Sequence, residues 1–446
     1  MVAFKIIFSI LYILLFIIAT SVMIIFERDK PRNIIFWMLG FLTNSIVTSI
    51  IYLIFKIFQH KKQQSLAVKQ WEDEVFVGLN NSNLHSVAVE TTDDFYSFNN
   101  LAFNTCLTKN NSYEIFSSYE KFKTAVEKEL GLAKKYIMLE LTTFGVDDFS
   151  PILSVLASKA QAGVVVKLVH DKRIKQSIKK QLKTAGVKIY KFSKWKSLGS
   201  IYSNRRNVIS IDGETVFVGG FDVSKRQMQP GVEVANTFFK FKGDVVQPMN
   251  VAIHQDMVFA SGKYIELSQV NNREVNNNCT IQFVANKANQ NVELLLIKAI
   301  CSAKTSIQLQ LEEFIPTESI MALLKYAIHS NIDVRLMVPL KTTMHSKYFA
   351  SRAYAKELAL EGANVYLYDG FIKFNSIIVD NKYALCGAFS LNRENVATCL
   401  QNVIILEDEK AISNFNKKFD LCVNNSYRIN NAKYLLLREK FFKNFV

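Results

Sequence analysis

Two segments of the sequence carry the same polar residue types at the same spacing. Each has a cation, an amide two residues later and a carboxylate five residues after the amide: Arg205, Asn207 and Asp212, then Lys373, Asn375 and Asp380. A cation near a carboxylate can bind a phosphate group, or the two can neutralise each other in a structural ion pair. Arginine stays protonated at physiological pH and cannot act as a nucleophile. A phosphate site and the two ion pairs, Arg205–Asp212 and Lys373–Asp380, are therefore both open.

These residues belong to two copies of one pattern of strands and helices. Strand-like runs at 135–144, 163–169 and 186–190 are matched by runs at 306–314, 332–338 and 363–368, with helix-length stretches between them. Segments 205–220 and 373–387 then correspond at a constant separation of 168 residues, as from Asp212 to Asp380. Such alternation predicts parallel β-α-β units. We expect an α/β fold of two repeats, each a mixed, mostly parallel sheet with flanking helices, facing across a central cleft.

Two apolar runs precede the repeats. Residues 6–26 and 34–55 are each long enough to cross the ~30 Å hydrocarbon core of a bilayer as a helix, and the polar stretch 27–32 separates them. Lys5 lies before the first run, and Lys56, Lys61 and Lys62 follow the second. Because basic residues favour the cytoplasmic side, we expect a two-span transmembrane hairpin in the cell membrane, with both termini and the main domain cytoplasmic. The expected organisation is 1–62 hairpin, 63–115 linker, 116–265 first repeat and 266–446 second repeat.

Several segments resemble phospholipase D enzymes, and bacterial cardiolipin synthases in particular. They are the polar turn 27–31 (Glu-Arg-Asp-Lys-Pro), 216–221 (Val-Phe-Val-Gly-Gly-Phe), 256–262 (Asp-Met-Val-Phe-Ala-Ser-Gly), 314–316 (Phe-Ile-Pro), 334–339 (Val-Arg-Leu-Met-Val-Pro) and 351–358 (Ser-Arg-Ala-Tyr-Ala-Lys-Glu-Leu). The resemblance implies one His-x-Lys-x4-Asp motif in each repeat. In that family one His attacks the phosphodiester, the other protonates the leaving alcohol, the Lys and a downstream Asn hold the phosphate, and each Asp is expected to orient a His.

The sequence departs from this motif in the same way in both repeats. The His, Lys, Asp and downstream Asn positions read Arg205, Asn207, Asp212 and Asp222 in the first repeat, and Lys373, Asn375, Asp380 and Ser390 in the second. Nucleophile, acid and phosphate clamp are thus missing together, so the resemblance implies a cardiolipin synthase homologue that is a pseudoenzyme. An active cardiolipin synthase that makes cardiolipin from phosphatidylglycerol is the alternative. A nuclease or other phosphodiesterase is disfavoured by the apolar runs and by the same missing His residues.

Charge suggests what the protein contacts. The net charge is +15, and residues 1–62 hold seven of the 54 basic and two of the 39 acidic residues, so the remainder keeps an excess of +10. We expect a basic patch on the membrane surface, formed by Lys172, Arg173, Lys175, Lys179, Lys180 and Lys183. The candidates for phosphate or headgroup binding are Arg205, Arg206, Lys373, Glu140 and Gln310. The expected partners are an anionic phospholipid membrane and either an intact cardiolipin synthase or a second copy of the chain; no nucleic acid, cofactor or metal is expected.

Overall fold

A computed structural model describes most of the 446 residues. The described residues are 2–27, 34–56, 84, 86–116, 118–142, 150–171, 174–192, 203–220, 234–261, 279–286, 292–340, 345–392, 399–429, 439 and 443. The chain divides into two compact units, one made of Met1–Phe76, Lys194–Ile201 and Asn444–Val446, the other of Val77–Ser193 and Tyr202–Lys443.

The first unit is built from apolar helical segments. Helix α1 spans Val2–Glu27, and a second helical segment covers Ile34–Lys56, which is long and apolar enough by composition to cross a membrane. The two segments share a small core of Ala19, Met23, Phe41 and Tyr52. Most of the large apolar side chains that are exposed in the described part of the chain lie on these segments. Apolar surface of this extent is characteristic of a segment that contacts lipid.

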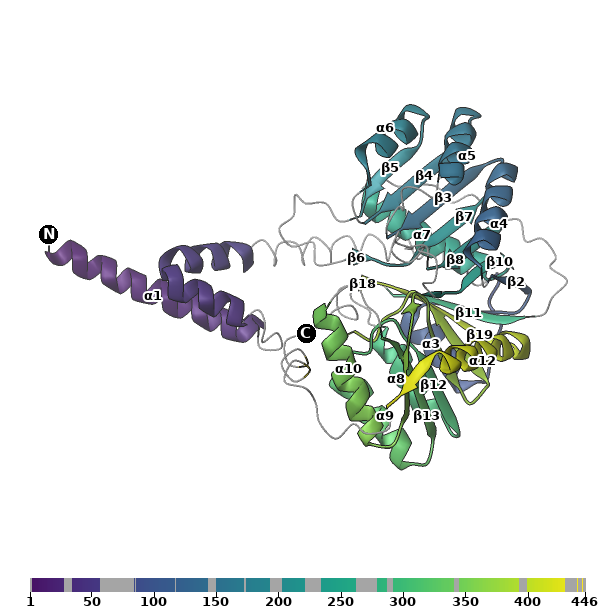
Figure 1. Ribbon diagram of the computed structural model, residues 1–446. Helices are drawn as coiled ribbons and strands as arrows, with labels where there is room; N and C mark the ends of the chain where they lie inside the picture. The colour runs from purple at the N-terminus through teal and green to yellow at the C-terminus, as the bar shows by residue number, and fades with distance from the viewer. Residues whose placement is uncertain are drawn as a thin grey trace. The chain divides into compact units, whose positions relative to one another are not determined.

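The segment Ile34–Lys56, expected as the second span, is folded back on itself in the structure. The ring centroids of Trp37 and Tyr52 lie 4.9 Å apart, although fifteen residues of straight helix advance about 22 Å. The Thr48 hydroxyl donates to the Gly40 carbonyl at 2.8 Å, and the backbone N–H of Val47 donates to Asn44 Oδ1 at 3.2 Å, as at a helix N-cap. Figure 1 draws the segment as two short helical arms.

The first repeat is built on a seven-stranded sheet in the second unit. Its order is β2-β10-β8-β7-β3-β4-β5. The strands are β2 (Asn111–Phe116), β3 (Tyr136–Leu141), β4 (Val165–His170), β5 (Lys188–Lys191), β7 (Val208–Ile211), β8 (Thr215–Gly219) and β10 (Phe238–Gly243). Helices α4 (Tyr119–Leu132), α5 (Ser150–Gln161) and α6 (Gln176–Thr184) pack on one face, and α7 (Val246–Ser261) packs on the other.

The second repeat is built on a nine-stranded sheet of order β1-β11-β19-β17-β16-β12-β13-β14-β20. The strands are β1 (Leu107–Thr108), β11 (Thr280–Ala285), β12 (Ser306–Gln310), β13 (Asp333–Pro339), β14 (Asn364–Tyr368), β16 (Asn375–Val379), β17 (Tyr383–Gly387), β19 (Asn402–Glu407) and β20 (Ser426–Arg428). Helices α8 (Glu293–Ser302), α9 (Glu318–His329) and α10 (His345–Leu360) pack on one side, and α12 (Glu409–Asn424) packs on the other.

The two sheets repeat one topology. Strands β3, β4 and β5 are parallel to one another, as are β12, β13 and β14. On its other edge β3 pairs antiparallel with β7, which pairs antiparallel with β8; β12 does the same with β16, which pairs with β17. The expected repeat is present, but the mostly parallel sheet is wrong. Hairpins such as β7–β8 add antiparallel strands, and antiparallel pairs outnumber parallel ones in each sheet.

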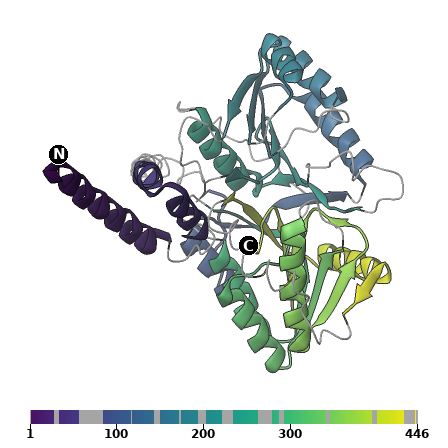
Figure 2. The same cartoon turned by 60° about the vertical axis from the view of Figure 1, so that its left-hand side comes forward.

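The repeats do not have separate cores. Each has its own outer cluster, and a third cluster combines the inner faces of both sheets with α7 and α12, through residues such as Val218, Phe239, Met249, Ile404 and Phe415. Figure 2 shows the two sheets of this unit from a second direction. Packing in this shared core therefore contributes to the stability of both repeats.

The linker expected over 63–115 extends less far than predicted. Residues 63–83 lie outside the described residues, but Asp94–Phe103 forms helix α3 and residues from Leu107 to Phe116 form β1 and β2. Strand β1 joins the sheet of the second repeat beside β11, whereas β2 joins the sheet of the first repeat beside β10. This stretch is therefore structural and connects both sheets.

Candidate functional site

The two motif carboxylates bind backbone amides. Asp212 accepts hydrogen bonds from the N–H groups of Lys134, Lys135 and Tyr136 at 2.7–2.8 Å. Asp380 does the same with the three residues that lead into β12. Both residues have a left-handed backbone, with φ of 52° and 53°. The carboxylates therefore fasten the turn before the first parallel strand of each repeat.

Asp380 accepts from the backbone N–H groups of Lys304, Thr305 and Ser306 at 2.7–2.9 Å and from the Thr305 hydroxyl at 2.8 Å. Partial burial acts to raise the pKa of Asp380, but the hydrogen bonds from these three residues outweigh it and hold the pKa below its usual range. The ion pairs Arg205–Asp212 and Lys373–Asp380, one of the two possibilities left open by the sequence, are not formed, because each carboxylate lies at the far end of a strand from its cation.

The two motif amides are also held by backbone groups. Asn207 Oδ1 accepts from the N–H of Thr142 at 2.8 Å, just after β3. Asn375 Oδ1 accepts from the N–H of Glu312 at 2.6 Å, just after β12, and its amide nitrogen donates to the Phe389 carbonyl. Both Asn side chains are buried. Each amide thus fastens the chain where the first parallel strand ends, and Asn207 does so with a φ of 49° that asparagine tolerates.

The two motif cations lie where the repeats exchange short strands. Strand β6 (Ser203–Asn204) pairs with β18 (Cys399–Leu400) of the other repeat, and the N–H of Arg205 donates to the Leu400 carbonyl at 3.0 Å. Strand β15 (Phe371–Ile372) pairs with β9 (Val234–Ala235), and the N–H of Lys373 donates to Ala235 at 2.9 Å. This reciprocal exchange places the segments that carry both cations at the interface between the repeats.

The side chain of Lys373 is paired with a carboxylate that the sequence did not indicate. Its ammonium lies 2.9 Å from Glu312 Oε1, and only 14% of the Lys373 side chain is exposed. Glu312 follows β12, so the ion pair is local to the second repeat. The Arg205 side chain is half-buried.

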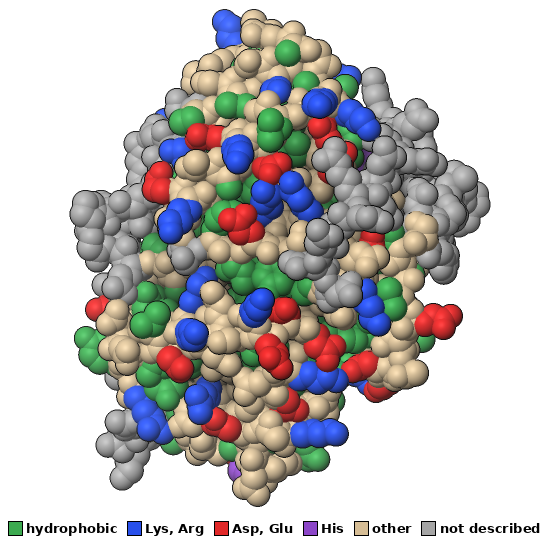
Figure 3. Space-filling model, turned by 90° about the vertical axis from the view of Figure 1, so that its right-hand side faces the viewer, with side chains coloured by type: hydrophobic (Ala, Val, Ile, Leu, Met, Phe, Trp, Pro, Cys, Tyr) green, Lys and Arg blue, Asp and Glu red, His purple; other side chains and the backbone are tan. Residues whose placement is uncertain are grey.

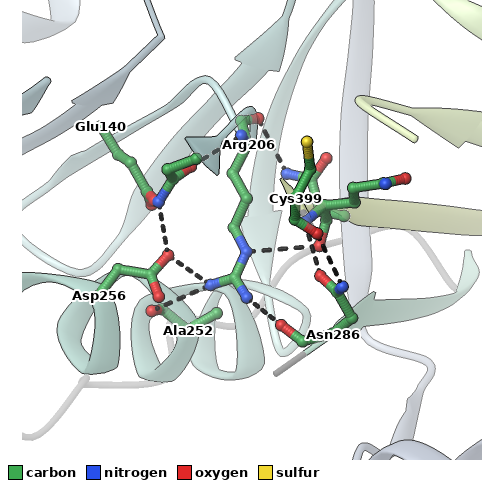
Figure 4. Close-up of polar contacts among 9 residues, drawn as sticks. Glu140, Arg206, Ala252, Asp256, Asn286 and Cys399 are labelled. Carbon is green, nitrogen blue, oxygen red and sulfur yellow. Dashed lines mark hydrogen bonds and ion pairs between the residues drawn. The ribbon is translucent and has the colours of Figure 1, made fainter. Parts of the chain in front are cut away.

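Arg206 is buried in a polar cluster that joins the repeats (Figure 4). Its guanidinium lies 2.5 Å from Asp256 Oδ2 on α7, and it also donates to the carbonyls of Asn286 and Gln401 in the second repeat. Only 3% of the Arg206 side chain is exposed. The expectation that Arg206 binds a headgroup is therefore wrong: its guanidinium is engaged within the protein.

Glu140 completes this cluster. Asn204 donates from one amide nitrogen to both Glu140 and Asp256, the latter at 3.0 Å. Burial raises the pKa of Glu140 well above its usual range, and the neighbouring Asp256 raises it further. Arg206 and Asp256 pair with each other beside Glu140, so the cluster is held by contacts within the protein. Glu140 is thus part of the interior of the protein and does not offer a carboxylate to a ligand.

Comparison with known proteins finds similarity to cardiolipin synthases. Residues 296–423 match the family model described as cardiolipin synthase, PLD-like domain. The major cardiolipin synthase ClsA of Bacillus subtilis (strain 168) is 28% identical over 463 residues, which cover 94% of each protein. A cardiolipin synthase of Oceanobacillus iheyensis is 26% identical and covers 94% of this chain and 92% of its own length. The chain is similar to cardiolipin synthases over nearly its whole length, and residues 296–423 match their phospholipase D-like domain.

A solved structure shows the same fold for this phospholipase D-like chain. The phosphatidylserine synthase of Haemophilus influenzae Rd KW20 superposes with a TM-score of 0.56 at 12% identity, covering 75% of this chain and 92% of that one. At this identity the likeness concerns the fold alone.

The remaining motif positions of the phospholipase D-like chain are only partly described. Asp222 lies outside the described residues. The Ser390 N–H donates to Gln401 Oε1 at 2.8 Å, and the Ser390 hydroxyl accepts from the N–H of Asn392 at 3.1 Å. Gln310 ends β12, half-buried, at the position that corresponds to Glu140.

The predicted basic patch is largely on helix α6. Lys172 and Arg173 lie outside the described residues. Lys175 precedes the helix, Lys180 and Lys183 are exposed on it, and Lys179 is half-buried. Within the described chain no carboxylate lies within ion-pair distance of Lys179, Lys180 or Lys183. Figure 3 shows a different kind of surface, where basic and acidic side chains alternate.

Sequence reasoning missed the residues that neutralise the interior of the site. Asp256 stood inside a segment recognised as typical of the family, which was a usable signal, but nothing in the sequence paired it with Arg206, fifty residues earlier. Glu312 follows Gln310 by two residues and carried no motif of its own.

Proposed function

We propose that this protein is a membrane-anchored cardiolipin synthase homologue without transferase activity, which binds anionic phospholipid or a functional synthase at the cytoplasmic face of the membrane. The observation that carries the proposal is the state of the two motif amides, Asn207 and Asn375. Each stands where the family has a phosphate-binding Lys, and each is buried and hydrogen-bonded to backbone groups. A neutral amide held in this way offers no positive charge to a phosphate.

The chemistry at the two His positions supports the same proposal. An arginine at 205 cannot be the nucleophile or exchange protons near neutral pH. The ammonium of Lys373 donates to Glu312, and an ammonium has no lone pair with which to attack phosphorus. The retained Asp212 and Asp380 bind backbone amides and so stabilise the fold whether or not the protein is an enzyme. Each retained motif carboxylate thus has a structural use that is independent of catalysis.

An assay of the purified full chain in phosphatidylglycerol liposomes tests this proposal, with the Bacillus subtilis relative as the positive control. We expect cardiolipin to form no faster than in protein-free liposomes. Cardiolipin formation above that background, abolished in Lys373→Ala, would overturn the proposal.

An active cardiolipin synthase is the second candidate. It is favoured by relatives that are named cardiolipin synthases and align over nearly the full length of this chain. In that case Lys373 would have to lose its proton, and Glu312 is the neighbouring base that could take it. Glu312→Gln would then abolish turnover, whereas the pseudoenzyme has no turnover to lose.

The lysines of α6 support the proposed contact with anionic lipid. The helix buries Ile178 and Leu182 and turns its basic side chains outward. Each basic residue near an anionic bilayer contributes about 1 kcal/mol, and salt screens this attraction. The apolar segments of the first unit would hold the domain near the bilayer, where such weak contacts act together.

Binding of the full chain to nanodiscs cannot separate these contacts from the anchor, so the test uses lateral enrichment. In vesicles with a small fraction of fluorescent cardiolipin, we expect the wild-type chain to gather the labelled lipid around it. Lys179→Glu, Lys180→Glu and Lys183→Glu together should remove most of the enrichment. The matched control reverses Lys121, Lys410 and Lys417, which are exposed on α4 and α12. Equal enrichment in both triple variants would show that α6 is only a solubilising surface.

A further inference from the structure

The fold-back of residues 34–56 fixes the length of its two arms. Residues 34–43 make one arm and 45–56 the other, so the arms measure about 15 and 18 Å. Neither length can cross a ~30 Å hydrocarbon core. The arms pack closely at Gly40, where an added Cβ atom would lie 2.8 Å from Thr48 Cγ2. A glycine is therefore needed where the arms meet.

The hairpin runs beside the second half of α1. Its tip meets the middle of α1, where the Tyr12 hydroxyl bonds to Ser45. Phe41 packs on Phe16 with ring centroids 5.7 Å apart. The open end of the hairpin lies near the end of α1, because Val22 and Ile34 pack against the same small core. The hairpin thus opens toward the Glu27 end of α1 and reaches about half of its length.

The polar groups of the tip are satisfied within the protein. The Thr43 hydroxyl donates to Gly40 O at 2.9 Å, and Asn44 caps the second arm. Irregular backbone is tolerated at membrane depth only where such partners exist. Both arms of the hairpin carry exposed apolar side chains, such as Leu39 and Leu42 on the first arm and Ile51 on the second. Contact with lipid requires such a surface.

The basic residues agree with a hairpin that enters and leaves on one side. Arg28, Lys30 and Arg32 precede it, and Lys56, Lys61 and Lys62 end or follow it, whereas Lys5 alone stands at the other end of α1. If residues 34–56 crossed the membrane, the first three would face away from the last three. If the hairpin is re-entrant, all six lie on one side, as the positive-inside rule favours.

We infer that α1 is the single span and that residues 34–56 form a re-entrant hairpin in the cytoplasmic half of the bilayer. The N-terminus then lies on the opposite side of the membrane from the large domain. This inference rests on the membrane anchoring proposed above, and it replaces the expectation that both termini are cytoplasmic.

Labelling with a membrane-impermeant maleimide tests this topology in the full-length chain. Val2→Cys reports the N-terminus, Asp29→Cys reports the segment between α1 and the hairpin, and the native exposed Cys301 reports the domain. Intact spheroplasts and inverted vesicles are labelled in parallel, and the modified cysteines are identified by mass spectrometry. We expect position 2 to label at least ten-fold more in spheroplasts, and positions 29 and 301 at least ten-fold more in inverted vesicles.

Every other pattern overturns the inference. Positions 2 and 301 on one side with 29 on the other would mean two spans, and would leave the proposed anchoring intact. Positions 2 and 29 together, opposite 301, would mean that residues 34–56 span. All three on one side would mean that neither segment crosses, and extraction of the chain by carbonate would then also refute the anchoring.

A variant of the hairpin gives a second test. Gly40→Leu places a side chain where Thr48 lies, so it should open the hairpin and move position 2 toward the domain side. Leu42→Val is the matched control, because 82% of Leu42 is exposed, and its labelling should equal that of the wild type. An unchanged pattern in Gly40→Leu would contradict the packing on which the inference rests.

Discussion

Replacement of Asp380 tests whether the retained motif carboxylate is structural. Asp380→Gly removes a carboxylate that accepts four hydrogen bonds of 2.7–2.9 Å while permitting the left-handed φ of 53°. A hydrogen bond to a charged group contributes about 1.5–3 kcal/mol when buried. Asp380 is only partly buried, so water can take the place of its carboxylate as a hydrogen-bond acceptor. We therefore expect the free energy of unfolding to fall by about 2–4 kcal/mol in total. Asp380→Ala should cost about 1 kcal/mol more, since alanine is strained in the left-handed region.

The pH dependence gives a separate check on Asp380. Its pKa is lowered in the folded protein, so its contribution to the free energy of unfolding is present above the unfolded pKa of about 3.9 and is lost as pH falls through the folded value. The difference between wild type and Asp380→Asn should therefore shrink on acidification. The assay is guanidinium unfolding of the full chain in detergent, followed by circular dichroism.

Asp420→Asn, on the exposed surface of α12, is the control that removes the same charge and should change stability by less than about 0.5 kcal/mol. If Asp380→Gly were equally harmless, the carboxylate would not fasten the turn before β12. The structural explanation for its retention would then fail.

Three further predictions concern the interior of the site and use the same unfolding assay. Glu140→Gln should stabilise the protein increasingly as pH rises. Because the pKa of Glu140 is raised in the folded protein, its contribution to the free energy of unfolding is fully present below the unfolded pKa of about 4.3 and is lost as pH rises toward the folded pKa. Parallel plots of unfolding free energy against pH for wild type and variant would contradict this. Arg206→Met should cost about 3–5 kcal/mol by leaving Asp256 buried without its partner, and adding Asp256→Leu should recover most of the loss. Asn207→Lys should cost about 2–4 kcal/mol through its φ of 49° and the unpaired N–H of Thr142, and Asn207→Gly should cost less.

The repeat and its strands could be predicted from the sequence because both copies keep apolar strands and the same turn residues. The strand expected over 135–144 is β3, and Asp212 and Asp380 occupy equivalent turns. The roles of these carboxylates were misjudged. Seven residues of extended chain advance about 23 Å, so Asp212 could not have reached the side chain of Arg205, seven residues earlier.

Other parts of the fold depend on partners that are distant in the chain. Arg206 looked available for a ligand because Asp256 and Asn286 meet it only in the folded protein. The two-residue strand β1 shows no periodicity of its own. The fold-back had a local signal that was overlooked, namely the polar residues 43–45 in the middle of an apolar run.

The position of β1 has a consequence for synthesis. Thr108 donates to the carbonyl of Ile281, 173 residues later in the chain. Ribosomes add about 5–20 residues per second, so β1 waits about 9–35 s for its neighbouring strand to be made. During that interval the edge of β1 and the apolar side of α3 are without their final cover. A chaperone that covers exposed strand edges would have this segment as a substrate during the interval.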